Sequence, residues 1–270
     1  MIYHDRKLLL QLPRVLRARD FHLYLEGGKR LSDLWREGGK AVCGHKTPHV
    51  LRELKNAAER GLLTSLPHPM ERRFIKALEL LFPGSSFRLY AHEGSLYRAL
   101  EAAGFAAPFY DPAISSEAQG ERQQGEKGVS LWRPFLEKTV PGTILVPVLP
   151  CPLGPAVLVL DKSVEASFAP GELIPPVLLA PAARAIHDMA ALLKTPVCQR
   201  YRKIEKALAG QKLWRRRGIY LCTDGEGYAA LFMKFLEGGF LLPPSPEEPA
   251  ILPFTMSDGE EAKLAQLIIN

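Results

Sequence analysis

The chain has 270 residues, of which 47% are hydrophobic and 24% are charged, a balance that is ordinary for a soluble globular protein. Its length allows a substantial core, in one large domain or in two small ones. Proline and charged residues interrupt every apolar run before it could span a membrane, and residues 1–10 lack the long apolar core of a signal peptide. We therefore expect a cytoplasmic protein without a membrane association.

The net charge of +6 is most concentrated at Arg215, Arg216 and Arg217. Because no interleaved aromatic residues or nucleic-acid-reading motif accompany this run, we interpret it as the solvated end of a helix just before a strand, and we expect no nucleic-acid partner. The four cysteines form no C-x-x-C pair, which argues against a zinc site and fits reduced thiols. They are Cys43, Cys151, Cys198 and Cys222.

The stretch 18–49 predicts a β-hairpin that leads into a helix. Apolar and polar residues alternate over 21–25, a Glu-Gly-Gly turn follows, and 30–35 forms the returning strand. Thr47 then supplies a helix cap, and Pro48 suits the first helical position. The residues by themselves predict only a hairpin that delivers the chain to a helix.

In its order and spacing, this stretch resembles the N-terminal entry of the class III aminotransferases. These enzymes depend on pyridoxal phosphate (PLP), have fold type I, and include glutamate-1-semialdehyde aminomutase. They show an aromatic-X-Tyr, a D/E-G-X-R turn, an Asp shortly after it, and then G-H-X-X-P. The matching residues are Leu23, Tyr24, Gly27 to Arg30, Asp33, Gly44, His45 and Pro48. The resemblance implies the same fold, a PLP cofactor, and a homodimer.

Two amphipathic helices and a short strand are expected next in the chain. Residues 48–60 and 69–81 each place their apolar side chains on one face, which is typical of helices that cover a core. Residues 87–91 then predict a strand. The class III aminotransferases show the same succession before the first strand of their large domain.

The strand 87–91 is followed by His92-Glu93-Gly94-Ser95 at a strand-to-helix turn. Backbone N–H groups without helical partners and the helix dipole make such a turn favourable for an anion. In the class III aminotransferases the equivalent turn reads S/N-G-X-E-A, and the resemblance implies that Gly94 and Ser95 hold the phosphate of PLP. The alternative is an ordinary capped helix.

Residues 143–148 and 156–160 are near-continuous apolar runs rich in Val, Leu and Ile, which is typical of buried parallel strands. The second run ends in Asp161. The resemblance implies that Asp161 pairs with the protonated ring nitrogen of PLP and so keeps the ring an electron sink. The alternative is a charged strand end that faces solvent.

A PLP transaminase needs a lysine that binds the cofactor covalently and then moves the proton. The family carries this lysine in a G-K-X-X-G-G-G segment, which this chain lacks. Lys162, beside Asp161, is the candidate catalytic lysine, and Lys194 is a second candidate. The alternative is that each is an ordinary surface lysine. The family's stacking Tyr-His-Gly is also missing, with Tyr110 as the nearby aromatic residue, so we expect an abridged central region.

The C-terminal third resembles the small domain of the same family. Residues 199–209 and 228–236 predict helices, 217–221 predicts a strand, and Ser257 with Glu260 forms a capping box that opens the last helix. In the family, a helix with an aromatic residue precedes a G-hydrophobic-hydrophobic-x-P-S segment, a short strand and a final helix. The matching residues are Phe235, Gly239, Leu241, Leu242, Pro244, Ser245 and Ser257.

Together these features predict an α/β protein with an abridged PLP-transferase fold of type I. A mostly parallel sheet with helices on both faces would span 47–195, and a small α+β domain would join 1–46 to 196–270. Helices 48–60 and 70–81 would contribute to a homodimer interface. Two functions stay open: a compact PLP-dependent aminotransferase or aminomutase acting on a small amino or keto compound, and a non-catalytic relative that binds or scaffolds.

Overall fold

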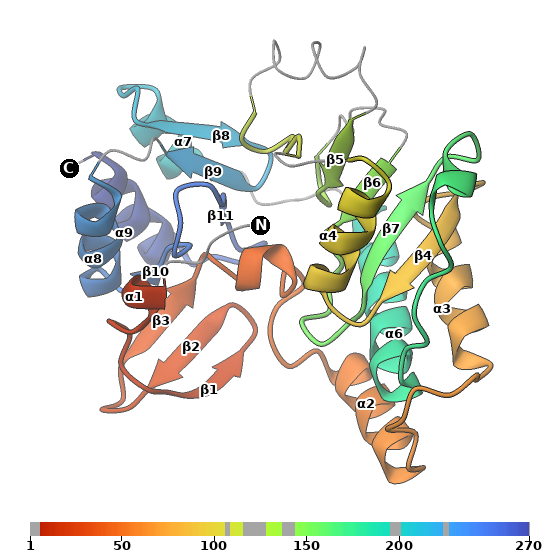
Figure 1. Cartoon of the computed structure of the whole chain (residues 1–270). Coiled ribbons are helices and arrows are strands. Elements are labelled where there is room, and N and C mark those ends of the chain that lie inside the picture. Colours follow the sequence, from red (N-terminus) through yellow and green to blue (C-terminus); the bar gives the residue numbers. More distant parts are fainter. Residues whose placement is uncertain are drawn as a thin grey trace. The chain divides into compact units, whose positions relative to one another are not determined.

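The structure, a computed structural model, describes most of the chain. The described residues are 6–105, 109–115, 128–136, 144–194, 201–223 and 227–269. The chain divides into two compact units (Figure 1). The first contains Thr47–Lys194, and the second combines the preceding segment Ile2–Lys46 with the following segment Thr195–Asn270.

The first unit contains a four-stranded sheet in the order β4-β7-β6-β5. Its strands are β4 (Ser86–Tyr90), β5 (Val129–Trp132), β6 (Ile144–Pro147) and β7 (Ala156–Leu160). β5 and β6 run parallel, whereas β7 is antiparallel to both of its neighbours. The expected α/β class is confirmed, but the expectation that β6 and β7 are parallel is wrong. Their apolar runs reflect burial on both faces, and burial does not fix strand direction.

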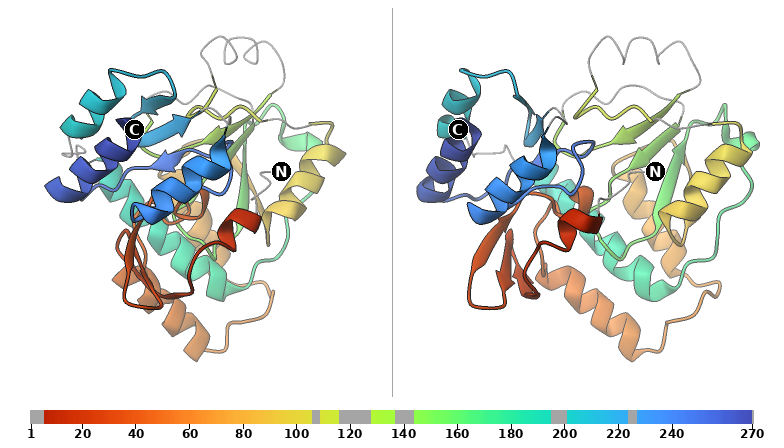
Figure 2. Two further views of the ribbon diagram at one scale, coloured as in Figure 1. Left: turned by 90° about the vertical axis from the view of Figure 1, so that its left-hand side faces the viewer. Right: turned by 60° about the vertical axis from the view of Figure 1, so that its left-hand side comes forward.

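Helices lie on both faces of this sheet (Figures 1 and 2). They are α2 (Pro48–Glu59), α3 (Met70–Glu79), α4 (Glu93–Ala102) and α6 (Pro176–Leu193). α4 contacts β4 and β7, while α2 and α3 pack on α6. α6 is long and apolar enough to cross a membrane. Half of this 18-residue helix is buried inside the unit, however, and the core helix of a globular protein has the same length and composition.

The core of the first unit forms between α4 and the sheet. It includes Tyr90, Leu96, Leu100, Val129, Ile144, Val146, Leu158, Leu160, Val164 and Phe168. Two aromatic pairs extend it, because the ring centroids of Tyr97 and Phe109 lie 5.5 Å apart and those of Phe105 and Phe168 lie 5.7 Å apart. Such stacked pairs each contribute about 0.5–1.5 kcal/mol beyond their buried area.

The two helices expected at a dimer interface differ in exposure. In α3, Met70, Phe74, Ala77 and Leu78 are buried. The apolar face of α3 is therefore used within the unit, and the expectation that it is exposed for dimerisation is wrong. In α2, by contrast, Ala57 is the one buried residue, and the larger apolar side chains of this helix stay partly accessible.

The second unit begins with the predicted hairpin. β1 (Val15–Arg19), β2 (His22–Leu25) and β3 (Arg30–Asp33) form a sheet with β10 (Phe240–Leu241). The hairpin of β2 and β3 is antiparallel as predicted, and β3 pairs in parallel with β10. The N-terminal hairpin and the C-terminal segment both resemble parts of one small domain, and this resemblance predicts a contact between them. The pairing of β3 with β10 is such a contact.

A second sheet of the same unit has the order β11-β9-β8 and is antiparallel. Its strands are β8 (Trp214–Arg217), β9 (Tyr220–Thr223) and β11 (Ala250–Ile251). The single strand predicted at 217–221 is instead a tight hairpin, because Gly218 adopts a φ of 57° and reverses the chain. The run 215–217 thus lies within β8. Its interpretation from the sequence as the end of a helix is wrong.

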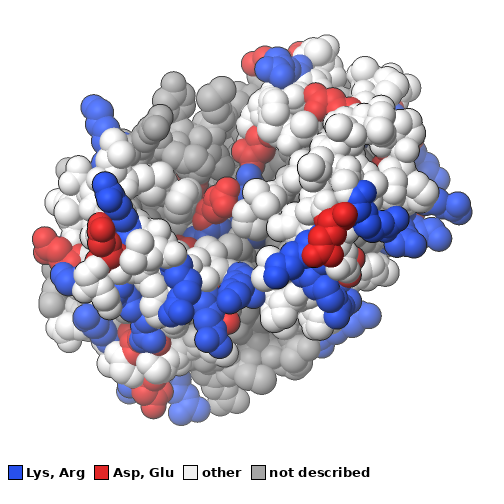
Figure 3. All heavy atoms as spheres, turned by 90° about the horizontal axis from the view of Figure 1, so that it is seen from below, with Lys and Arg blue, Asp and Glu red and all other residues white. Residues whose placement is uncertain are grey.

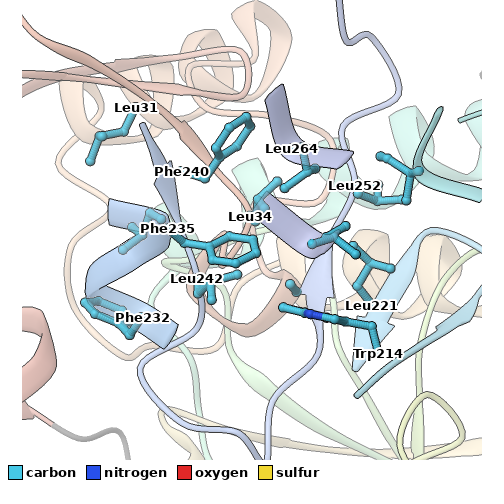
Figure 4. Packing of buried hydrophobic residues seen from close by; sticks show 14 of the residues in the cluster. Leu31, Leu34, Trp214, Leu221, Phe232, Phe235, Phe240, Leu242, Leu252 and Leu264 are labelled. Carbon is cyan, nitrogen blue, oxygen red and sulfur yellow. The ribbon is translucent and has the colours of Figure 1, made fainter. Parts of the chain in front are cut away.

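Helices and both sheets enclose the core of the second unit (Figure 4). The helices are α1 (Arg6–Leu9), α7 (Arg202–Leu208), α8 (Tyr228–Glu237) and α9 (Asp258–Ile269). Leu34, Phe232, Phe235 and Leu264 are fully buried, and the rings of Phe235 and Trp214 lie 5.3 Å apart. Truncation of one such aromatic residue to alanine costs about 3–5 kcal/mol.

A buried polar network stabilises the exit from the hairpin. The Asp33 carboxylate accepts hydrogen bonds from the Trp35 N–H at 2.9 Å and the Arg36 N–H at 2.8 Å, and it lies 2.8 Å from Nε2 of His45. The Arg36 guanidinium donates to the carbonyls of Asp33, Val42 and Ile251. Asp33 and His45, two residues of the N-terminal motif, therefore have a structural role.

Candidate functional site

The turn between β4 and α4 is the predicted anion site, and His92 caps it. The Ser95 N–H donates to Nδ1 of His92 at 3.1 Å, and the Ser95 hydroxyl lies 3.3 Å from Nε2 of the same ring. Arg98 donates to the Ser95 hydroxyl at 3.2 Å. A Cβ on Gly94 would lie only 3.2 Å from Nδ1 of His92, so that glycine suits this close approach.

A carboxylate of the chain already occupies this turn. The Ala91 N–H donates to Oε2 of Glu172 at 2.7 Å. This hydrogen bond, a second one from Ser95, and the charges of His92 and Arg98 lower the pKa of the Glu172 carboxyl, against the opposing effect of burial. Glu172 is therefore an anion at neutral pH, and it is held beside the turn by the Ala91 N–H, which precedes the helix cap His92.

Asp161, the expected partner of the PLP ring nitrogen, ends β7 and is fully exposed. Its Oδ1 accepts the Ser163 N–H at 2.8 Å, which closes a local turn. Hydrogen bonds from Ser163 lower the pKa of Asp161, with a smaller contribution from the charge of Lys162. This geometry corresponds to the alternative interpretation of Asp161 as a solvated strand end.

The strand register separates Asp161 from the α4 turn. Tyr90 pairs with Ala156, and Ser86 pairs with Leu160, because β4 and β7 are antiparallel. Asp161 therefore follows β7 at the Ser86 end of the pair, while Gly94 and Ser95 follow β4 at the other end. Four residue steps along a strand span about 13 Å. The structure thus brings Gly94 and Ser95 together, but it does not bring Asp161 or Lys162 to them.

The lysines of the described ranges all keep some solvent contact, and none belongs to the buried core. Lys162 and Lys194 are both exposed. A lysine that forms a Schiff base needs an apolar pocket or nearby cations, which make its neutral form accessible. Neither candidate lysine has such surroundings, and each corresponds to the alternative interpretation as a surface residue.

A buried ion pair lies at the carboxyl end of β5 and involves two residues that the sequence did not single out. Arg133, which follows β5, is 1% exposed and forms a two-pronged ion pair with Asp111, with a shortest distance of 2.6 Å. Tyr110 pairs with Ser130 of β5 and is buried. The sequence did not predict β5, because a long polar stretch precedes this strand. For the ion pair, the signal in the sequence is weak: an Asp and an Arg each follow an apolar run.

The second unit has a cavity of about 600 Å³ at the start of α8. Its lining consists of Leu8, Gly227, Tyr228, Ala229, Ala230, Pro244, Ser245 and Pro246. The Tyr228 hydroxyl donates to the carbonyl of Pro243, and the Ser245 hydroxyl accepts the Glu247 N–H, so that both polar groups serve the surrounding loop. Among the described residues, no three His, Cys, Asp or Glu side chains come together as a metal site.

The basic run in β8 is also used within its own unit. The Arg216 guanidinium donates to Glu205 at 2.7 Å and to the Gly218 carbonyl at 2.6 Å, and it lies over the Tyr201 ring.

On the face drawn in Figure 3, Lys and Arg side chains are interspersed with Asp and Glu. Mixed charge of this kind is typical of a solvated surface.

Two proteins resemble the chain over most of its length. It is 28% identical over 297 residues to an uncharacterized protein of Treponema pallidum, with 93% of this chain and 92% of that protein covered. It is 26% identical over 264 residues to an uncharacterized protein of Borreliella burgdorferi, with 95% and 90% covered. No family model matches the chain.

Solved structures with a similar fold are PLP-dependent aminotransferases. Acetylornithine aminotransferase from Elizabethkingia anophelis has a TM-score of 0.66 at 14% identity, with 95% of this chain and 92% of that chain covered. Ornithine delta-aminotransferase of Plasmodium falciparum has a TM-score of 0.66 at 12% identity, with 98% and 96% covered. An omega-transaminase from Sphaerobacter thermophilus has a TM-score of 0.64 at 10% identity, with 95% and 90% covered. At these identities the likeness shows the fold of this superfamily and no more.

Proposed function

We propose that this protein is a pseudoenzyme with the fold of the PLP-dependent aminotransferases, which lacks the Schiff-base lysine and serves as a binding or scaffolding protein. The observation that carries the proposal is the antiparallel pairing of β4 with β7. One small cofactor cannot touch Gly94 and Asp161 together when they lie at opposite ends of this pair. The two ends are separated by about 13 Å of strand.

The groups that would hold PLP support the same conclusion. The Glu172 carboxylate already accepts the Ala91 N–H at the turn where the phosphate would lie. Asp161 could not reach the ring nitrogen of a cofactor held at this turn, since it belongs to the other end of β7. The exposure of Lys162 and Lys194 removes the apolar surroundings that a Schiff-base lysine needs. The described residues therefore do not fit PLP as a single site, and we derive no reaction from them.

An absorbance titration of the purified protein with PLP tests this proposal. We expect the spectrum to equal the sum of free PLP and protein, and dialysis to remove all of the cofactor. A yellow protein that keeps its colour through dialysis would favour the other candidate function, a compact aminotransferase or aminomutase. The same protein unfolded in urea presents its lysines without any pocket, and it provides the background for nonspecific colour.

We also propose that the chain forms a homodimer through α2 and the residues that follow it. The support is an apolar surface that the described residues of the first unit leave accessible. Val50, Leu51 and Leu54 are only partly buried, and Leu63 and Leu66 are 59% and 63% exposed. Several accessible apolar side chains within one segment, residues 50–66, support an interaction surface there.

A further inference from the structure

One segment of the second unit concentrates positive charge. Residues 201–217 contain seven Lys and Arg residues and a single acidic residue, Glu205, so that the segment has a net charge of +6. The whole chain also has a net charge of +6, and the remaining residues therefore carry equal numbers of each sign. A local excess of this size attracts anionic partners to the surface that carries it.

The segment forms two elements that contact each other, the helix α7 and the strand β8. The Arg216 guanidinium of β8 donates to the Glu205 carboxylate of α7 at 2.7 Å, so the acidic side chain of the segment is already used within the unit. The fully exposed cations around this contact are Arg202, Lys203, Lys206, Lys212 and Arg215. Together with Arg216 and Arg217 they form the basic surface of α7 and β8.

The helix α9 packs on α7 and brings further acidic residues close to it. Glu260 lies 2.8 Å from Nε2 of His22, and the buried Glu261 accepts the Lys203 N–H at 2.7 Å. Both carboxylates are thus engaged within the unit. The cations further along α7 and in β8 therefore set the charge of the basic surface.

β8 is the end strand of its sheet, whose order is β11-β9-β8 (Figure 1). In an antiparallel ladder, the backbone N–H and C=O groups of alternate residues point away from the paired strand. No other strand of the described ranges pairs with β8, so its outer edge presents main-chain donors and acceptors. An extended polypeptide can pair with such an edge by adding a strand, whereas a nucleic acid has no backbone amides with which to form this ladder.

The aromatic side chains of the segment also favour a polypeptide over a single-stranded nucleic acid. Tyr201 and Trp214 are 2% and 4% exposed, because both rings pack in the core of the second unit. Unpaired bases bind by stacking on accessible aromatic rings, and residues 201–217, all of them described, offer none. Arginine guanidinium groups, by contrast, form strong two-pronged pairs with carboxylates.

We propose that the basic surface of α7 and β8 binds an extended acidic segment of a partner protein, which adds as a strand at the outer edge of β8. This inference rests on the proposed function, because it names the surface and the partner of a protein that we propose to bind or scaffold. Side chains of an added strand alternate between the two faces of the sheet. Carboxylates on one face would lie near Arg216 and α7, and those on the other face would lie near Arg215 and Arg217.

Charge reversal at two exposed lysines tests the electrostatic part of the proposal. One protein carries Lys206→Glu and Lys212→Glu, in the last turn of α7 and just before β8. The matched control carries Lys29→Glu and Lys46→Glu, two exposed lysines of the same unit that lie outside the basic surface. Both proteins have the same net charge, and circular dichroism confirms that each is folded before any titration.

The probe is a short fluorescein-labelled peptide in which Glu alternates with Thr, and its binding is followed by fluorescence anisotropy. We expect the variant with Lys206→Glu and Lys212→Glu to bind about tenfold more weakly than the unchanged protein, because each reversal replaces an attraction by a repulsion. The control should bind as the unchanged protein does.

A second peptide, with Pro in place of each Thr, tests the addition of a strand. It keeps the charge of the first peptide but lacks half of the main-chain donors and does not fit a ladder. We expect it to bind the unchanged protein severalfold more weakly than the Thr peptide does. Only the Thr peptide should slow the hydrogen exchange of the amides in β8.

Any of four results would overturn the inference. They are no binding of the Thr peptide, equal affinity of the charge-reversed variant and its control, equal affinity for the Thr and Pro peptides, and tighter binding of an oligonucleotide of equal charge. The last result would assign the basic surface to nucleic acid. None of these titrations contains PLP, so they can fail while the proposed function stands. The proposed function fails instead if PLP becomes attached to one lysine of the unchanged protein.

Discussion

Replacement of Arg36 by methionine should strongly destabilise the second unit. Arg36 has no exposed surface, and its guanidinium donates to the carbonyls of Asp33, Val42 and Ile251 at 3.3, 3.1 and 3.2 Å. The cation also lies 4.4 Å above the ring of Phe21. Burial lowers the pKa of Arg36 to about 10, while Asp33 acts in the opposite direction, so that the group stays charged at neutral pH.

The expected loss follows from the partners that methionine would leave behind. Each buried acceptor without a donor costs about 1–3 kcal/mol, and the buried Asp33 carboxylate would also lose the attraction of a nearby cation. Simple addition of the three bonds overestimates the effect, because water can reach some carbonyls after the side chain is shortened. We therefore expect the free energy of unfolding to fall by about 3–5 kcal/mol.

Urea unfolding, followed by tryptophan fluorescence and circular dichroism, measures this loss. For a unit of this size, the loss corresponds to a midpoint lower by about 1–2 M urea. The control is Arg30→Met, because Arg30 is 53% exposed and its bond to Glu260 contributes about 1 kcal/mol or less. Equal midpoints for the two variants would refute the argument and show that the carbonyls around Arg36 find other donors.

Three further predictions concern other parts of the chain. Gly171→Ala should destabilise the first unit by about 1–3 kcal/mol through the clash with Leu89, whereas Gly259→Ala, with open space around its Cβ, should not; thermal melts compare them. Burial alone would raise the pKa of Glu260, but bonds from His22 and Ser257 lower it to about 2. Stability present above pH 4.5 should thus decline toward pH 2, by about 1–2 kcal/mol, and acid titration of Glu260→Gln should lack this decline. Light scattering should give about twice the chain mass of 30.0 kDa, and a mass near 30 kDa at micromolar concentration would exclude the homodimer.

Local signals in the sequence predicted much of the fold. The hairpin of β2 and β3, the helices α2, α3 and α8, and the capping box are all confirmed. In the capping box, the Ser257 hydroxyl accepts the Glu260 N–H, and the Glu260 carboxylate accepts the Ser257 N–H, both at 3.2 Å. These elements depend on residues within a few positions of each other, which a single sequence displays directly.

Strand direction and the position of Glu172 beside the α4 turn could not be predicted in the same way. β6 and β7 are equally apolar whichever way they run, so the pattern gave no indication that β7 carries Asp161 away from Gly94. Glu172 reaches the turn from about 80 positions further along the chain, and a Gly-Glu pair in an extended segment has no local signature. Both features arise from tertiary packing, which overrides local preference.

The proposed function requires that no lysine of this chain, described or not, forms a Schiff base with PLP. Incubation with PLP, reduction with borohydride and peptide mapping by mass spectrometry test it most directly, because reduction makes any such bond permanent. We expect labelling at or below the level of the chain unfolded in urea, spread over several exposed lysines that include Lys162 and Lys194. Stoichiometric labelling of one lysine, abolished by its replacement with alanine, would contradict the account.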